Sequence, residues 1–435
     1  MRLYSTNSPS EFVTLKEAVL KGLPDDNGLF MPEQIPVLPA SFFEELENDT
    51  FQETAFKVTK TLIQGALPDD ILRTIINGTV SFPTPLVHLR DNQYILELFH
   101  GPTLAFKDFG ARFMSRLMSH FVQGNERELV ILVATSGDTG SAVANGFYNV
   151  KGIRVVVLYP NGKVSDLQER QMTTLGGNIT ALRIDGTFDD CQRLVKQAFL
   201  DKELNIVHQL TSANSINIAR LIPQMFYYFE GYKQLLKKGI DGREVVFTVP
   251  SGNFGNLTAG LIAKKMGLPV DKFIAAVNNN DVFHQYRETG KYEPRPSVQT
   301  VSNAMDVGAP SNFARMMDLY KHDLELLKSE ISTGTVSDDT IKAEVTKIFE
   351  ENNYVLDPHT AVGLDIMNTY QAANTNSIGV VLSTAHPAKF IDVVEACINE
   401  KIDLPDALGV LVDREKDFKE MSIDFNDFKT FLKAF

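Results

Sequence analysis

Continuous apolar runs recur along the chain and alternate with longer stretches of helical periodicity. The runs occupy residues 128–134, 154–160, 179–184, 244–250, 273–277 and 379–383. Because strands buried on both faces of a sheet are apolar throughout, these runs predict parallel strands. Helical patterns of ten to fifteen residues between them predict βαβ units. The expected fold class is therefore α/β, with ligands bound at the carboxyl ends of the strands.

The first 85 residues lack these apolar runs and are predicted to be mainly helical. A loop is expected at residues 25–28, where Asp, Asn and Gly follow one another. Pro83 and Pro85 stand close together and disfavour helix, so a boundary is placed there. At the other end, residues 414–435 are predicted to pack as a terminal helix.

Composition narrows the class of protein. The 435 residues are 43% hydrophobic and carry a formal net charge of −13, which disfavours disorder and nucleic acid as the main partner. No apolar stretch approaches about 18 residues, and no signal peptide is expected, so no membrane partner is predicted. Cys191 and Cys397 show no metal or disulfide spacing, which favours a reducing compartment.

The first segment with candidate chemistry is FHGPTLAFKDFG, at residues 99–110. Lys107 lies between Phe106 and Phe109, and lysine is seldom placed among apolar side chains without a role. Desolvation lowers the pKa of such an amine, which can then form a Schiff base with a carbonyl. A surface Lys–Asp pair at the start of a helix explains the same residues equally well.

Two glycine-containing loops follow predicted strands. Thr135, Ser136, Gly137, Asp138 and Thr139 offer free backbone N–H groups to a carboxylate or phosphate, although simple helix capping is the alternative. The second loop, SGNFGN at residues 251–256, matches neither a dinucleotide nor an ATP motif, and it forms either a cradle for one phosphate or a tight turn.

A fourth segment, STAHPAKF at residues 383–390, places Thr384 after a predicted strand. Its hydroxyl either caps a helix or bonds to a ring nitrogen. A Schiff-base lysine, a phosphate cradle, an anion loop and a hydroxyl at a strand end together describe a pyridoxal phosphate site.

The same segments closely resemble the threonine synthase family. FHGPTLAFKDFG, TSGDTG, SANSINIAR, PSGNFGN and STAHPAKF occur in the family's order, and NGLFMP near the start also matches. The resemblance implies fold type II of the pyridoxal-phosphate-dependent enzymes, similar to the tryptophan synthase β chain. It implies two parallel-sheet α/β domains and a mainly helical N-terminal domain, divided at 1–85, 86–235 and 236–435.

The resemblance also implies a lyase that converts O-phospho-L-homoserine to L-threonine in the cytoplasm, as a monomer. Lys107 would carry the cofactor, beside Phe106. The cofactor's phosphate would bind a loop that comprises Gly252, Asn253, Phe254, Gly255 and Asn256. Thr384 would face the pyridine nitrogen, and Asp138 would lie near the ring. Thr135, Ser136, Gly137 and Thr139 would hold the substrate carboxylate.

The substrate's phosphate needs a site of its own, for which residues 211–220 are suited. Arg220 can bind phosphate through two parallel N–H donors. Asn217, Arg220 and Gln224 would share one helical face. A capped helix with Arg220 in a surface salt bridge is the alternative; the family match favours the phosphate site, with Asn214, Ser215 and Arg220 as ligands.

Three other functions compete with this interpretation. A serine or threonine dehydratase or a β-replacement enzyme would use the same cofactor but would need no second phosphate site. A non-catalytic relative would not need the complete set of Lys107, Thr384, phosphate loop and Arg220. A nucleotide-dependent kinase would need an ATP loop, which the sequence lacks.

Overall fold

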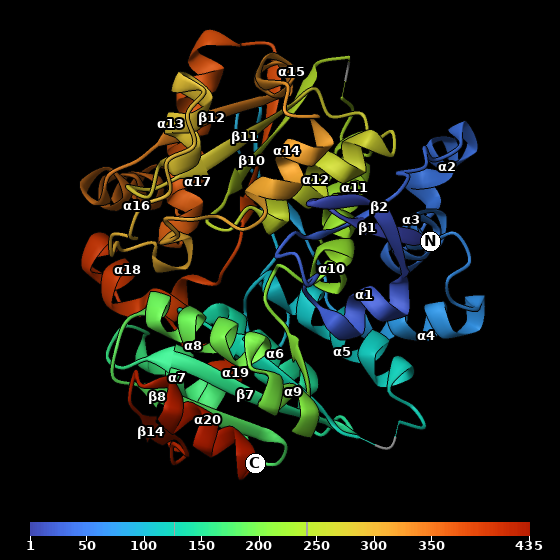
Figure 1. Cartoon of the computed structure of the whole chain (residues 1–435). Coiled ribbons are helices and arrows are strands. Elements are labelled where there is room, and N and C mark those ends of the chain that lie inside the picture. Colours follow the sequence, from blue (N-terminus) through green and yellow to red (C-terminus); the bar gives the residue numbers. More distant parts are fainter. Residues whose placement is uncertain (126, 241) are drawn as a thin grey trace.

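Two sheets form the centre of the computed structural model, which describes residues 1–125, 127–240 and 242–435 (Figure 1). The larger sheet has the order β12-β11-β10-β13-β5-β4, and all its neighbours are parallel except β4 and β5. Its strands are β4 (Leu86–Arg90), β5 (Gln93–Glu97), β10 (Glu244–Pro250), β11 (Lys272–Val277), β12 (Ile331–Thr335) and β13 (Ser377–Ser383). Every residue of β13 is buried, as expected of a central parallel strand.

The second sheet is parallel throughout, in the order β14-β8-β7-β6-β9. Its strands are β6 (Leu129–Ala134), β7 (Ile153–Pro160), β8 (Ile179–Ile184), β9 (Gln209–Ser212) and β14 (Lys419–Met421). The apolar runs predicted as strands are all confirmed as β6, β7, β8, β10, β11 and β13, with ends that differ by at most two residues. The α/β class is therefore confirmed.

Helices cover both sheets and connect their strands. Between β5 and β10 the helices are α5 (Lys107–Phe121), α6 (Asp138–Phe147), α7 (Asp166–Thr173), α8 (Phe188–Leu200), α9 (Lys202–Val207), α10 (Ile218–Leu221), η2 (Ile222–Met225) and α11 (Phe226–Leu236). Later in the chain come α12 (Gly255–Lys265), α13 (Val282–Thr289), η3 (Asn303–Met305), α14 (Phe313–Leu319), α15 (Leu324–Glu330), α16 (Asp338–Asn352), α17 (Pro358–Ala373), η4 (Pro387–Phe390), α18 (Ile391–Ile398), α19 (Asp406–Gly409) and α20 (Phe425–Lys433). The terminal helix predicted for residues 414–435 is confirmed only in its last part, as α20, because Lys419–Met421 form a strand instead.

The N-terminal region is mainly helical, as predicted, but it also contains a small sheet that the sequence did not indicate. Its helices are α1 (Leu15–Lys21), α2 (Ala40–Glu45), η1 (Leu46–Asn48), α3 (Phe51–Ile63) and α4 (Asp69–Thr79). Its antiparallel strands are β1 (Arg2–Ser5), β2 (Ser8–Thr14) and β3 (Phe30–Pro32). β2 is almost wholly exposed, so it carries no apolar pattern.

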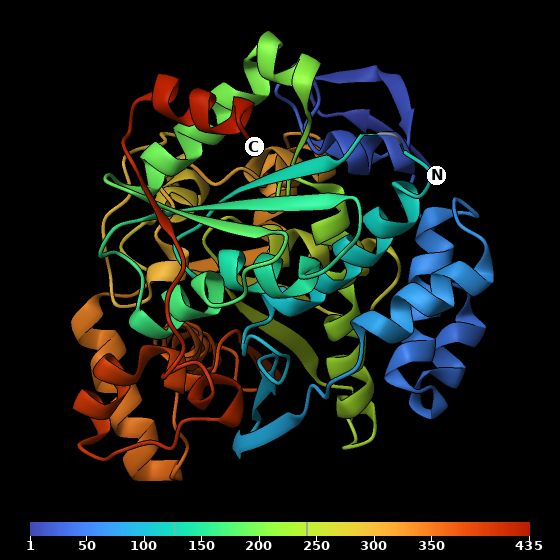
Figure 2. The ribbon, with the colours of Figure 1, turned by 90° about the horizontal axis from the view of Figure 1, so that it is seen from below.

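Two segments cross the boundaries drawn from the sequence. β4 and β5, placed with residues 86–235, pair into the sheet that contains β10 and β13. β14 pairs with β8, and α20 packs on α8 and α9, so the end of the chain joins the other sheet (Figure 2). We propose a three-part division at residues 1–85, 86–235 and 236–435, with two exceptions. β4 and β5 belong structurally with residues 236–435, and β14 and α20 belong structurally with residues 86–235.

Among the described residues, no helix is long and apolar enough to cross a membrane. Nor does this described part contain a group of three or more His, Cys, Asp or Glu side chains arranged to hold a metal ion.

Candidate active site

One cavity lies where strands of both sheets end. Segments that follow β6, β9, β10 and β13 line it, together with the start of α5. The predicted residues found in its lining are Phe106, Lys107, Thr135, Ser136, Thr139, Asn214, Ser215, Arg220, Gly252, Asn253, Phe254, Gly255, Asn256 and Thr384. Two of the predicted site residues, Gly137 and Asp138, do not line this cavity. Segments almost 280 residues apart in sequence are therefore brought together at the carboxyl ends of parallel strands.

Lys107 is the first residue of α5 and presents an amine to the cavity. Burial is the main cause that lowers the pKa of this amine to about 8; the charge of Asp138 opposes it, and the charges of Arg220 and Lys389 act with it. A backbone hydrogen bond of 2.9 Å from Phe106 N to Thr384 O holds this segment beside the end of β13. A lysine that is largely neutral above pH 8 can act as a nucleophile or as a base.

We expect acetylation of Lys107 by acetic anhydride to be half-maximal near pH 8, because only the neutral amine reacts. The ammonium form predominates below this pH and the amine above it, whereas an ordinary lysine changes near pH 10.4. Peptide mass spectrometry of the cofactor-free protein measures the profile, with the exposed Lys151 as internal reference. A Lys107 profile that coincides with that of Lys151 would contradict the expectation.

The loop after β10 is held in a tight conformation. Asn256 accepts a hydrogen bond from Ser251 Oγ at 2.6 Å and donates one to Pro250 O at 2.8 Å. Phe254 has a left-handed φ of 57°, and a Cβ on Gly252 would lie 2.8 Å from Met305 Cα. The loop leads directly into α12, whose first turn leaves backbone N–H groups free for a phosphate. Asn256 therefore shapes the loop with its side chain.

The loop after β6 is stabilised in a similar way. Thr135 Oγ1 accepts hydrogen bonds from Gly137 N at 2.9 Å and from Gly140 N at 2.8 Å. Gly137 has a φ of 136°, and a Cβ there would lie 2.5 Å from the Gln168 side chain, so only glycine fits. Gly137 thus determines the course of the loop, while Ser136 and Thr139 line the cavity.

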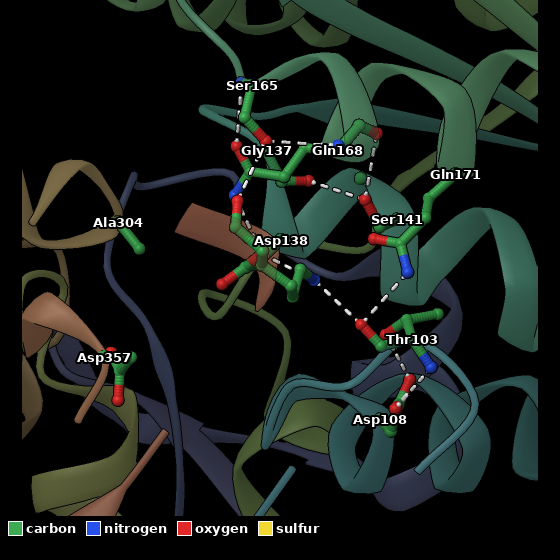
Figure 3. Close-up of polar contacts among 12 residues, drawn as sticks. Thr103, Asp108, Gly137, Asp138, Ser141, Ser165, Gln168, Gln171, Ala304 and Asp357 are labelled. Carbon is green, nitrogen blue, oxygen red and sulfur yellow. Dashed lines mark hydrogen bonds and ion pairs between the residues drawn. The ribbon is translucent and has the colours of Figure 1, made fainter. Parts of the chain in front are cut away.

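Asp138 begins α6 but is turned away into a buried ion pair. Its Oδ1 lies 2.7 Å from Lys389 Nζ and accepts a hydrogen bond from Gln168 Nε2 at 2.9 Å (Figure 3). Burial alone would raise the pKa of Asp138, but Lys389 and Lys107 hold it well below its usual range. Lys389 Nζ also donates to Thr103 O at 2.8 Å. The pair therefore joins the β6 loop to the segment that carries Thr384.

Arg220 carries a buried positive charge. It is 3% exposed, and its Nη1 donates to Ala213 O at 2.5 Å. Burial lowers the pKa of Arg220 to about 10, and distant Asp108 opposes this only in part. Within residues 1–125, 127–240 and 242–435, no carboxylate forms an ion pair with Arg220, and its Nε has no hydrogen-bond partner. Because a buried unpaired charge is costly, Arg220 is suited to an anionic ligand.

The neighbours of Arg220 connect this anion site to the β10 loop. Asn253 Nδ2 donates to Ser215 Oγ at 3.0 Å, and Asn214 Nδ2 donates to Ala134 O at 2.8 Å. Asn217 does not share a face with Arg220 as predicted, because the helix begins at Ile218 and Asn217 caps it. The Asn217 amide donates to the carbonyl groups of Val19 and Ser212 instead.

His359 also lines the cavity, although the sequence did not point to it. Its Nδ1 lies 2.8 Å from Asp357 Oδ1, and Ala304 N donates to its Nε2 at 3.2 Å. This pattern places the ring proton on Nδ1. Asp357 also caps α17. The sequence Asp-Pro-His-Thr is therefore typical of the start of a helix and does not by itself indicate a functional histidine.

Sequence profiles of known families match consecutive parts of the chain. "Threonine synthase N terminus" matches residues 2–80, "Pyridoxal-phosphate dependent enzyme" residues 79–384 and "Threonine synthase, C-terminal" residues 360–432. Threonine synthase of Haemophilus influenzae is 45% identical over 435 residues, which cover 99% of each chain. The chain belongs to the threonine synthase family.

Solved structures of threonine synthases have the same fold. The Escherichia coli enzyme has a TM-score of 0.94 at 41% identity and covers 100% of both chains. The pyridoxal-phosphate-bound threonine synthase of Brucella melitensis has a TM-score of 0.92 at 35% identity, covering 100% of this chain and 99% of that one. The chain is thus a fold type II lyase of threonine biosynthesis with pyridoxal phosphate as cofactor. The dehydratase and β-replacement alternatives are not favoured.

The residues of this cavity fit that cofactor. In the described part of the chain, no ion pair or hydrogen bond engages Lys107 Nζ, so the amine is available. The glycine-rich loop at α12 offers backbone donors beside it, and Thr384 lines the same cavity. Pyridoxal phosphate needs a reactive amine, a phosphate cradle and a ring partner, and all three are present.

Proposed function

We propose that the enzyme converts O-phospho-L-homoserine and water to L-threonine and inorganic phosphate. The observation that carries this proposal is the buried Arg220, which lies in the cavity without an acidic partner among the residues described. A substrate without a phosphate would leave this charge uncompensated in the closed site. A phosphorylated amino acid would neutralise it.

Each group of the cofactor has a matching protein group in this proposal. The loop of Gly252, Asn253, Phe254 and Gly255 would bind its phosphate, and Lys107 would hold it covalently. The Thr384 hydroxyl would face the ring nitrogen, beside Phe106. When bound, pyridoxal phosphate supplies an electron sink that stabilises negative charge at the substrate's Cα.

The substrate would be held at both of its acidic ends. The β6 loop would bind the carboxylate through its backbone N–H groups and through Ser136 and Thr139. Arg220, Asn214 and Ser215 would bind the phosphate. Because Asn253 bonds to Ser215, the cofactor's cradle and the substrate's phosphate site are fixed relative to each other.

Lys107 would move the protons of the reaction. Its neutral amine removes the Cα proton, and a Cβ proton is lost before the Cγ–O bond to phosphate breaks. The phosphate leaves with both electrons of that bond, next to the guanidinium of Arg220. A proton is then added at Cγ, and a water oxygen bonds to Cβ while that water gives up one proton, which balances the charge of the released phosphate. Return of a proton from Lys107 to Cα completes threonine, with its methyl group at Cγ and its hydroxyl group at Cβ.

We expect Arg220→Ala to raise KM for O-phospho-L-homoserine by roughly 10- to 150-fold, which corresponds to a charged hydrogen bond of about 1.5–3 kcal/mol. Arg220→Lys, which keeps the charge but loses the two-pronged geometry, should have an intermediate KM. Phosphate release and threonine formation measure activity, and equilibrium dialysis of the cofactor provides the control. An unchanged KM, or faster turnover of L-serine than of the phosphorylated substrate, would refute the proposal.

The proposed working unit is a monomer in the cytoplasm. Cys191 and Cys397 are both free, which agrees with a reducing compartment.

A further inference from the structure

A second cavity lies where α4, α5 and the end of α6 meet, away from the active site. Its volume is about 600 Å³, which is within the range of small-molecule sites. The polar side chains used below are Arg112, Arg116, Ser119, His120, Gln123 and Asn145. Arg116 lies nine residues after Lys107 on α5, so about 14 Å of helix separates the cavity from the catalytic amine.

Arg116 is the unusual group of this cavity. Its Nη1 donates to Arg112 O at 3.0 Å, but no carboxylate of the described chain pairs with it. Burial, together with the positive charge of Arg112, lowers the pKa of Arg116 to about 10. A half-buried cation beside another cation is electrostatically unfavourable, and none of the described residues supplies an anion that pairs with it, although the net charge of the chain is −13.

The packing around Arg116 is built to admit its guanidinium. A Cβ on Gly78 of α4 would lie 2.2 Å from Arg116 Nε, so a side chain at this position would displace the guanidinium from its observed place. Arg112 is fixed nearby, because its Nη2 donates to Gly78 O at 2.7 Å and to Ser81 Oγ at 2.8 Å. Arg112 thus uses N–H donors in hydrogen bonds within the protein, whereas most N–H donors of Arg116 are available to a ligand.

From this arrangement we propose that the cavity is a second anion site, which binds a small metabolite through a phosphoryl or carboxyl group held by Arg116. Ser119, His120, Gln123 and Asn145 supply further donors around the anion. Both groups present two oxygen atoms to the planar guanidinium fork, which is the chemistry that they share. The occupant would contact α4 of the N-terminal region and α5, the helix that carries Lys107 at its other end.

Equilibrium dialysis of the holoenzyme with radiolabelled inorganic phosphate tests the site. We expect two bound phosphates per wild-type chain, one at Arg220 and one in this cavity. Arg116→Gln should weaken the second by at least tenfold and leave the first, whereas Arg220→Gln should do the reverse. Loss of the Arg220-dependent phosphate alone would count against the proposed function and not against this inference.

Three further variants make the result specific. Gly78→Ala keeps every charge but displaces Arg116, and it should weaken the same phosphate. Lys151→Gln removes one exposed positive charge elsewhere and should leave both phosphates bound. Arg116→Lys should bind with intermediate affinity. Competition by acetate would show that the site accepts a carboxyl group, and its absence would restrict the ligand to phosphates.

Basal turnover should be unchanged in Arg116→Gln, which also shows that this variant is folded. The inference is overturned if Arg116→Gln and the wild type bind phosphate equally. It is also overturned if every phosphate bound to the wild-type chain depends on Arg220, or if Lys151→Gln weakens binding as much as Arg116→Gln does.

Discussion

Lys107→Ala should lower turnover of O-phospho-L-homoserine by at least about 10³-fold, because the variant loses the group that transfers the protons. The visible absorbance that covalent attachment of the cofactor gives should also be lost. The amine of Lys107 is available for both tasks, because burial lowers its pKa to about 8. Assays of phosphate and threonine on the same sample, together with an absorbance spectrum, measure both effects.

Two controls separate the chemistry of Lys107 from its packing. Lys107→Arg retains a positive charge but cannot give up its proton near neutral pH, so it should be as inactive as the alanine variant. Added methylamine should restore part of the turnover of Lys107→Ala, since it supplies a free amine in the space left by the side chain. Turnover within tenfold of the wild type in either variant would remove Lys107 from the mechanism.

Lys389→Met should destabilise the protein by about 3–5 kcal/mol, because it leaves Asp138 as a buried carboxylate without its counter-ion. Lys389 is fully buried, and its Nζ contacts Asp138 at 2.7 Å and Thr103 O at 2.8 Å. Urea unfolding followed by circular dichroism measures the loss. Activity should fall as well, since the pair fixes the β6 loop relative to Thr384.

A double-mutant cycle tests whether the lost stability comes from the pair. Combining Lys389→Met with Asp138→Asn should recover a large part of the stability lost in Lys389→Met, because no charge is then left buried. Simple addition of the two single effects would refute the interpretation. The folded-state pKa of Asp138 is depressed, so its contribution is complete above the ordinary aspartate pKa near 3.9 and is lost as the pH falls below it.

The central strands could be predicted from the sequence because they are buried on both faces. β6 and β13 consist of buried residues only, so their apolar runs are continuous. β12 (ISTGT) and β14 (KEM) lie at the edges of their sheets and are only partly buried. Their sequences therefore contain polar residues and show no continuous apolar run. The pairing of β5 with β13 could not be found either, because no local pattern specifies a partner so distant in sequence.

The site shows the same division between local and distant information. The loops after β6 and β10 were found because glycines and hydroxyl groups follow a strand directly. Asp138 was placed near the cofactor ring by the family resemblance, and that role stays a prediction. Its buried ion pair with Lys389, about 250 residues later, could not be predicted, because no local pattern specifies so distant a partner. His359 was missed for a similar reason, since its place in the cavity depends on how α17 packs and not on its neighbours in sequence.

The exchange of segments between the two sheets has a consequence for biosynthesis. β5 leaves the ribosome early, but its partner β13 follows about 290 residues later, a delay on the order of 15–60 seconds at about 5–20 residues per second. β8 likewise lacks its partner β14 until residues 419–421 have been synthesised. Neither sheet can be completed by a growing chain. The nascent protein therefore carries unpaired strand edges until translation is almost finished, and it is then most exposed to aggregation and most dependent on chaperones.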